Sequence, residues 1–143
     1  MRAMKKSTMS ILLSVSFLLI SFVMKAQQDE FFFKAAGTPA NLKVDVSWNR
    51  YYTYAGITDI LKKLASAYPD LVTLESMGKS YQGKDIWVAA ISNKKAGNPD
   101  HKPGFWIDGN IHSIEIQGSE MALYTAWYLC EMFDENKFIS ELL

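Results

Sequence analysis

The chain has 143 residues with 15 basic and 15 acidic side chains, so its formal net charge is zero. Hydrophobic residues make up 49% of the sequence and aromatic residues 13%. This composition excludes a disordered chain and is sufficient for the core of one modest domain. A neutral chain has no electrostatic reason to bind nucleic acid or an anionic membrane surface, and we expect neither as a partner.

Residues 1–26 have the pattern of a cleaved signal peptide. Arg2, Lys5 and Lys6 form a basic start, and residues 9–23 are apolar except for serines. This run is shorter than the ~18–20 residues of a membrane span, so an uncleaved anchor is the less favoured alternative. We therefore expect a secreted or periplasmic protein without a membrane span after cleavage. Cleavage would leave 11 basic and 15 acidic residues.

Residues 27–47 show no clear pattern and predict an N-terminal arm or linker that packs on the following domain, residues 48–143. The aromatic-rich stretch at residues 48–54 favours core packing over a substrate cleft. A helix is predicted next, with Thr58 as its N-cap and Pro69 just beyond its end. The apolar residues that recur at helical spacing are Ile57, Ile60, Leu61, Leu64 and Tyr68.

Two strands should follow this helix. Residues 71–77 alternate between apolar and polar, which predicts a half-buried strand, and residues 85–91 predict its partner in a β-hairpin. Residues 78–84 form the glycine-bracketed loop between them. After a polar surface loop, residues 105–108 are apolar without alternation, which predicts a strand that is covered on both faces.

A long helical pattern occupies residues 119–133. Apolar side chains form two stripes and leave only a narrow polar edge at Glu120 and Glu131, so we expect a helix buried nearly all round. Cys130, the single cysteine, cannot form an intrachain disulfide and is expected to be a buried free thiol. The predicted elements do not supply enough cover for this helix, so the sequence indicates an interrupted domain.

His112 and Glu115 lie between the predicted strand and this helix, and we interpret them as metal ligands. Hydrolytic zinc sites commonly use three protein ligands, often two His and one Glu, and leave one position for water. Side chains at i and i+3 can converge on one ion where the backbone turns tightly. By itself the pattern is short, and a His that is satisfied within a surface turn is the alternative.

No third zinc ligand is predicted within the sequence. The chain holds two His and one Cys. His101 lies beyond the far end of the predicted strand, roughly 20 Å from His112, and reads as a solvated loop residue. Cys130 is about 22 Å along the helix from Glu115. The third ligand is therefore expected from outside these residues.

Three motifs occur in order along the chain. Residues 52–54 (YTY) precede the first helix, and Tyr68-Pro69 with Leu71-Val72 follow it. Residues 78–86 (GKSYQGKDI) form the hairpin loop, and residues 109–115 (GNIHSIE) contain the two candidate ligands. Together they resemble the opening third of a zinc carboxypeptidase of the M14 metallopeptidase family, and the resemblance covers roughly residues 48–143. The second motif is similar to the family's G-x-S-x-E-G-R-x-I, with Gln82 and Lys84 as mild departures, and the third is similar to its G-x-x-H-x-x-E.

The resemblance implies an α/β fold with a mixed β-sheet flanked by helices, present here only as an incomplete N-terminal part. It implies a peptide substrate and a single Zn²⁺ held by His112, Glu115 and a later His. A zinc-activated water would then hydrolyse C-terminal peptide bonds. The family's general base and substrate-binding residues lie downstream, so no catalytic or substrate-binding residue is assigned.

Three hypotheses follow for the function. The first is the N-terminal part of a secreted zinc metallocarboxypeptidase. The second is the same fold acting as a cell-wall peptide amidase or an N-acyl amino acid deacylase. The third is a truncated remnant without catalysis. Under each of them we expect these 143 residues alone to be inactive, and the oligomeric state is not predicted.

Overall fold

The computed structural model describes Gly37 and residues 39–143. The predicted signal peptide, residues 1–26, and the predicted arm up to residue 36 lie outside the described residues. Among the residues that are described, no helix has the length and apolar character needed to cross a membrane.

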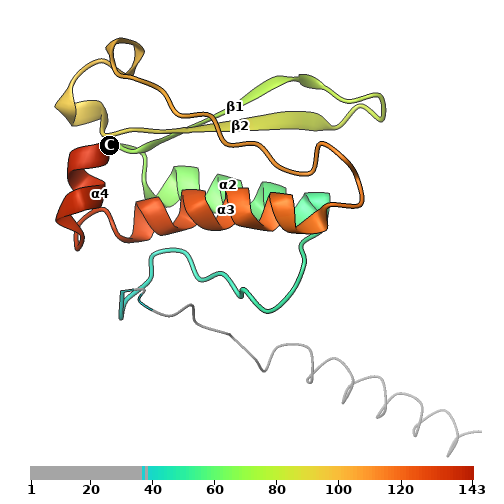
Figure 1. Cartoon of the computed structure of the whole chain (residues 1–143), viewed down its shortest axis with the longest axis horizontal. Coiled ribbons are helices and arrows are strands. Elements are labelled where there is room, and N and C mark those ends of the chain that lie inside the picture. The colour runs from blue at the N-terminus through green and yellow to red at the C-terminus, as the bar shows by residue number, and fades with distance from the viewer. Residues whose placement is uncertain (1–36, 38) are drawn as a thin grey trace, which may run out of the picture. The chain divides into compact units, whose positions relative to one another are not determined.

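The described elements form a helical layer with a hairpin on one side and residues 39–53 on the other (Figure 1). Helix α2 packs against β1, helix α3 packs against β2, and the two helices contact each other. In chain order the elements are α2 (Tyr54–Ala67), β1 (Val72–Lys79), β2 (Asp85–Ile91), η1 (Lys94–Ala96), η2 (Pro99–His101), α3 (Ile116–Glu131) and α4 (Lys137–Leu142).

Helix α2 begins earlier than the sequence predicted. Its N-cap is Thr53, whose side-chain oxygen accepts a hydrogen bond from the Gly56 amide at 3.3 Å. The prediction of Thr58 as the cap was wrong because the apolar periodicity starts only at Ile57. Thr58 instead accepts a hydrogen bond from Nε1 of Trp87 at 3.0 Å, which ties α2 to β2. The end of the helix before Pro69 is confirmed.

The predicted hairpin is confirmed, with β1 and β2 antiparallel and Val72 opposite Ile91. Strand β1 runs two residues further than predicted, to Lys79. The turn closes with a 2.7 Å hydrogen bond from the Ser80 amide to the Lys84 carbonyl. Gly83 has φ +75°, a left-handed conformation that a residue with a Cβ adopts only with strain.

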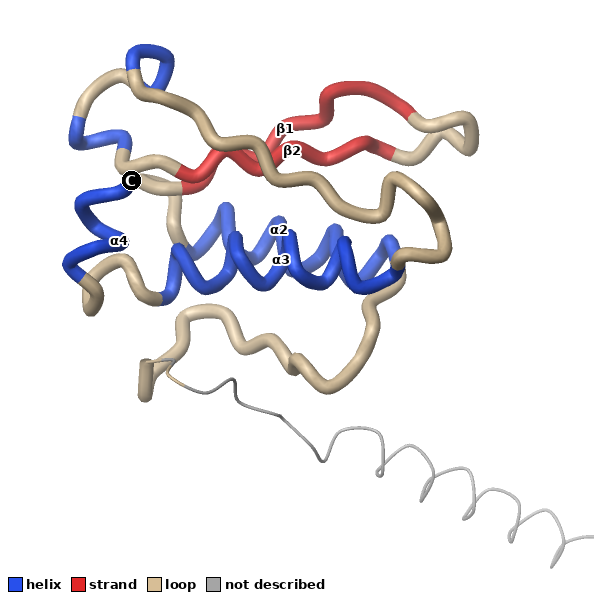
Figure 2. The backbone as a smooth tube through the Cα atoms, in the orientation of Figure 1, coloured by secondary structure: helices blue, strands red, loops and turns tan. Residues whose placement is uncertain are grey.

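The predicted covered strand at residues 105–108 is not formed. Phe105 and Trp106 are 90% and 66% exposed, and residues 103–110 follow an extended path without strand pairing (Figure 2). A strand requires a neighbour that pairs with its amides and carbonyls. Within the described residues the sheet contains β1 and β2 alone, and these strands pair with each other. The prediction was wrong because no described segment supplies such a neighbour for this apolar run.

From residue 118 to its end, helix α3 is buried or partly buried at every position except Met121, which largely agrees with the prediction of a helix buried nearly all round. Leu123, Trp127 and Cys130 are at most 3% exposed, whereas Met121 on the second stripe is 61% exposed. The predicted buried free thiol at Cys130 is confirmed. Burial raises the pKa of this thiol from 9.0 to about 12, and the neighbouring Glu131 charge adds to the effect.

Glu131 was predicted on a polar edge, and this was wrong. It is 6% exposed, and its two carboxylate oxygens accept hydrogen bonds from the amides of Lys43 and Val44 at 3.1 and 2.8 Å. The Val44 carbonyl in turn accepts a 2.7 Å hydrogen bond from Nε1 of Trp127. These bonds fix residues 43–46 against α3, and Val44 and Val46 lie in the core.

These elements agree with part of the predicted α/β fold. Helices α2 and α3 pack on a two-stranded antiparallel sheet, and the core lies between the helices, the start of β1 and residues 44–46. The larger mixed sheet flanked by helices remains a prediction.

Candidate metal site

A tight turn brings His112 and Glu115 together, as their spacing predicted. The Glu115 amide donates a 2.9 Å hydrogen bond to the His112 carbonyl, which closes the turn. Nδ1 of His112 lies 3.1 Å from Oε2 of Glu115. The two side chains are 73% and 57% exposed, so the pair faces solvent.

The pair lies at the N-terminus of helix α3. Glu115 is the N-cap residue, and its carbonyl accepts the Gly118 amide at 2.9 Å. Its side chain makes no capping hydrogen bond, and its carboxylate contacts the His112 ring instead. A carboxylate is stabilised near the positive end of the helix dipole, whereas a bare cation there would be repelled. Glu115 therefore offsets the unfavourable field that a metal ion would meet.

The loop before this turn lies directly against the helix. A Cβ built on Gly109 would overlap the carbonyl carbon and oxygen of Gly118, and one built on Gly118 would lie 2.8 Å from the amide nitrogen of Asn110. Asn110 itself has φ 64°, in the left-handed region that Asn tolerates better than most residues. Gly118 was missed in the sequence analysis, although a glycine in the first turn of a helix was a usable signal.

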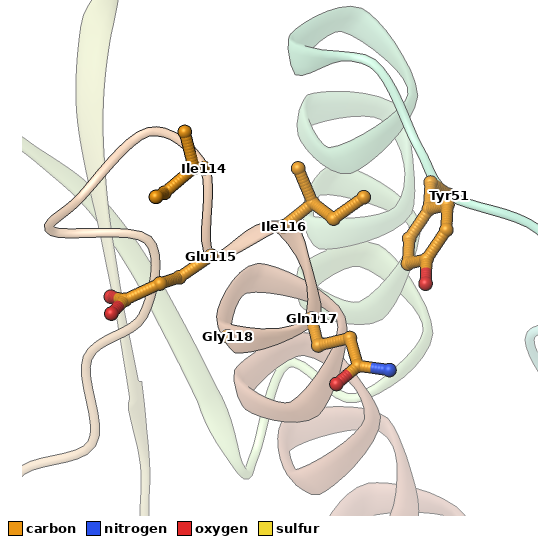
Figure 3. Close-up of a pocket in the computed structure, with 6 residues that line it drawn as sticks. All are labelled: Tyr51, Ile114, Glu115, Ile116, Gln117 and Gly118. Atoms are coloured by element: carbon orange, nitrogen blue, oxygen red, sulfur yellow. The ribbon is translucent and has the colours of Figure 1, made fainter.

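A hollow of about 290 Å³ adjoins the turn. Its lining consists of Tyr51 and residues 114–118. Figure 3 shows the side chain of Tyr51 and the carboxylate of Glu115 on opposite sides of the segment that leads into α3. The lining combines the apolar or aromatic side chains of Tyr51, Ile114 and Ile116 with the polar residues Glu115 and Gln117. The predicted core packing of the aromatic stretch is confirmed at Trp48 and Tyr52, which pack against the core. Tyr51 of the same stretch is 58% exposed and lines the hollow.

The donor pair fits one zinc ion. Two donors of a tetrahedral zinc ion, each about 2.0–2.2 Å from the metal, are roughly 3.3–3.6 Å apart. The 3.1 Å separation of Nδ1 and Oε2 needs only a small outward movement of two exposed side chains to match this value. Imidazole and carboxylate are also a ligand combination that zinc uses.

No third donor joins this pair in the part of the chain that the structure describes. There, no three residues of the types His, Cys, Asp and Glu come close enough to share a metal ion. His101 is exposed on η2, which agrees with its prediction as a solvated residue. Cys130 is buried in the C-terminal turn of α3.

Comparison with known proteins identifies relatives of this chain. The family model for zinc carboxypeptidases, Peptidase M14, matches residues 57–143, more than half of the chain. Carboxypeptidase D of Drosophila melanogaster is 30% identical over 93 residues, which are 65% of this chain and 7% of that protein. Carboxypeptidase Z of Gallus gallus is 36% identical over 81 residues, 57% of this chain and 12% of that protein. The chain thus spans a small part of the length of these relatives.

Proposed function

The chain belongs to the zinc carboxypeptidase family, Peptidase M14, and we propose that residues 48–143 are the N-terminal part of a metallocarboxypeptidase domain. In this proposal the domain hydrolyses C-terminal peptide bonds of peptide substrates. His112 and Glu115 are two of the three protein ligands of one Zn²⁺. The third ligand and the general base come from residues outside this sequence.

The observation that carries the proposal is the convergence of Nδ1 of His112 and Oε2 of Glu115 to 3.1 Å on a solvent-facing turn. When bound, zinc would lower the pKa of a water molecule and polarise a substrate carbonyl. The task of His112 and Glu115 is to hold and orient the ion. Zinc binds an unprotonated imidazole nitrogen, so protons compete with the metal and zinc binding to the pair should weaken as the pH falls.

A zinc titration of the chain tests the ligand assignment. The chain has two histidines, so imidazole NMR signals can be assigned by substitution and His101 serves as an internal control. We expect Zn²⁺ to shift the His112 signals at concentrations that leave those of His101 unchanged. Binding should be weak because two ligands do not complete the coordination shell.

Matched variants sharpen this test. Glu115→Ala should weaken the zinc response of His112 about tenfold or more. Glu135→Ala, which removes another exposed carboxylate, should leave the response unchanged. A tight one-to-one complex that survives His112→Ala would contradict the assignment, as would a His112 signal that ignores zinc.

The coding sequence beyond the Leu143 codon tests the larger proposal. An open frame that supplies a further His and a Glu near the two ligands would support a complete peptidase domain, and a stop codon there would support a remnant. In such a complete domain, Glu115→Ala should lower kcat/KM by at least about 100-fold, since even partners of metal ligands are worth about 10–100-fold. Near-normal turnover would exclude a ligand role.

We further propose that residues 1–26 direct export and are then removed. The basic start and the short apolar run support this proposal. Expression in a secreting host, followed by mass spectrometry of the exported product, would test it. A mature N-terminus near Gln27 is the expected result, and a product that retains Met1 in the cytoplasm would overturn it.

A further inference from the structure

The contact between Gly109 and Gly118 joins the two segments that carry the proposed ligands. Gly109 begins the loop that leads to His112, and Gly118 lies in the first turn of α3, three residues after Glu115. A Cβ on Gly109 would also lie 2.8 Å from the Ser119 amide nitrogen, in addition to its overlap with the Gly118 carbonyl. The backbones therefore meet without room for a side chain on either.

The close backbone contact explains why a glycine occupies position 118 inside a helix. Gly is the poorest helix former apart from Pro, and Ala the best, so an unconstrained position in α3 would favour Ala. A Cβ at position 118 would lie 2.8 Å from the amide nitrogen of Asn110 and 3.2 Å from Cα of Gly109. Both neighbours are backbone atoms, which cannot turn away as a flexible side chain can. The loop itself would have to move.

We propose that Gly118, together with Gly109, is a positioning residue that sets the height of the loop over α3 and thereby brings Nδ1 of His112 to Oε2 of Glu115. His112 belongs to the turn and Glu115 to the helix start, so a displacement of the loop changes the distance between their donor atoms. The role in metal binding rests on the proposed function. The juxtaposition of the two side chains does not, and it is measured without metal.

The test compares Gly118→Ala with Gly104→Ala in the whole chain. Gly104 is the matched control because a Cβ there would meet nothing within 4 Å. The first readout, without metal, is the nuclear Overhauser contact between the His112 ring and the Glu115 side chain. The second is the Zn²⁺ concentration that half-shifts the His112 signals. Circular dichroism and tryptophan fluorescence report whether each variant folds.

In Gly118→Ala we expect the His112–Glu115 contact to be lost and the half-shifting Zn²⁺ concentration to rise about tenfold, while helicity is unchanged or higher. Gly104→Ala should behave as the native chain does. An intact contact and an unchanged zinc response in folded Gly118→Ala would overturn the proposal.

Failure of the proposed function gives a different pattern. In that case the native His112 does not respond to Zn²⁺, whereas the metal-free contact still disappears in Gly118→Ala. If Gly118→Ala does not fold, the same measurements on Gly109→Ala decide the matter, because this change clashes from the loop side and leaves the sequence of α3 intact. Persistence of the contact in Gly109→Ala would then overturn the proposal.

Discussion

Replacement of Glu131 by Ala should destabilise the fold through residues 43 and 44, which lie almost 90 positions away in sequence. The carboxylate accepts the buried amide of Val44 at 2.8 Å and the partly buried amide of Lys43 at 3.1 Å. Glu131 is the last residue of α3, where the helix dipole disfavours a negative charge. Its burial at this point is tolerated because two backbone donors face it.

The expected loss follows from these contacts. Hydrogen bonds to a charged group contribute about 1.5–3 kcal/mol each, and a buried amide left without a partner costs about 1–3 kcal/mol. Water can reach the Lys43 amide, so its hydrogen bond to Glu131 is assigned the low end of this range. Relief of the unfavourable dipole interaction returns about 0.3–1 kcal/mol. We therefore expect Glu131→Ala to lower the free energy of unfolding by about 2–4 kcal/mol, a large part of the roughly 5–15 kcal/mol of a typical domain.

Urea unfolding followed by tryptophan fluorescence measures this loss, and amide hydrogen exchange locates it. Exchange at Val44 should accelerate more than exchange in the β-hairpin, which Glu131 does not contact. Glu131→Gln, which retains one acceptor, should cost about half as much as Ala. The exposed control Glu135→Ala should stay within about 0.5 kcal/mol of the native chain. A Glu131→Ala midpoint equal to that of this control would refute the reasoning.

Three further changes have defined outcomes. The folded pKa of Cys130 is raised to about 12, so the protonated thiol stabilises the fold fully below pH 9 and less as the pH rises toward 12. Between pH 9 and 12 this group should make the free energy of unfolding fall by at most about 1.4 kcal/mol per pH unit. Cys130→Ala should remove this contribution, and an unchanged pH dependence in the variant would contradict the burial of the thiol. Thr53→Ala should cost about 1 kcal/mol in thermal unfolding by removing the cap of α2, and an unaltered melting temperature would argue against that cap. Trp106→Ser should change stability by less than about 0.5 kcal/mol, whereas a loss of several kcal/mol would place this side chain in a core after all.

Local patterns predicted the local structure well. The alternation in residues 71–77, the glycine-bracketed turn and the helical periodicity of α2 and α3 each depend on neighbours within a few positions. The His112–Glu115 pair belongs in part to the same class, because the two residues are three positions apart and a hydrogen-bonded turn joins them. Even here the cap of α2 was misplaced, since the apolar repeat gives the direction of the buried face more reliably than the helix start.

The errors concern residues whose environment is set by distant segments. Glu131 lies in an apolar helix and looked like its polar edge, and nothing near it in sequence indicates the amides of residues 43 and 44. Phe105 and Trp106 show the opposite error: they were predicted to be buried and are exposed. An apolar run is buried only where another segment covers it. A local sequence pattern indicates which environment a side chain favours, but segments distant in sequence determine whether the folded chain provides that environment.

In the candidate site the backbone is held by contacts with other segments, whereas the two donor side chains are exposed. Helix α3 is fixed along its length, because Glu120 accepts the Tyr52 amide at 2.7 Å near its start and Glu131 binds residues 43 and 44 at its end. The Gly118 contact then fixes the loop against that helix. By contrast, the two donor side chains are exposed and held by nothing but each other. An anchored backbone with free donor atoms can adjust by the few tenths of an ångström that a metal ion requires, as the proposed ligand role of the pair demands.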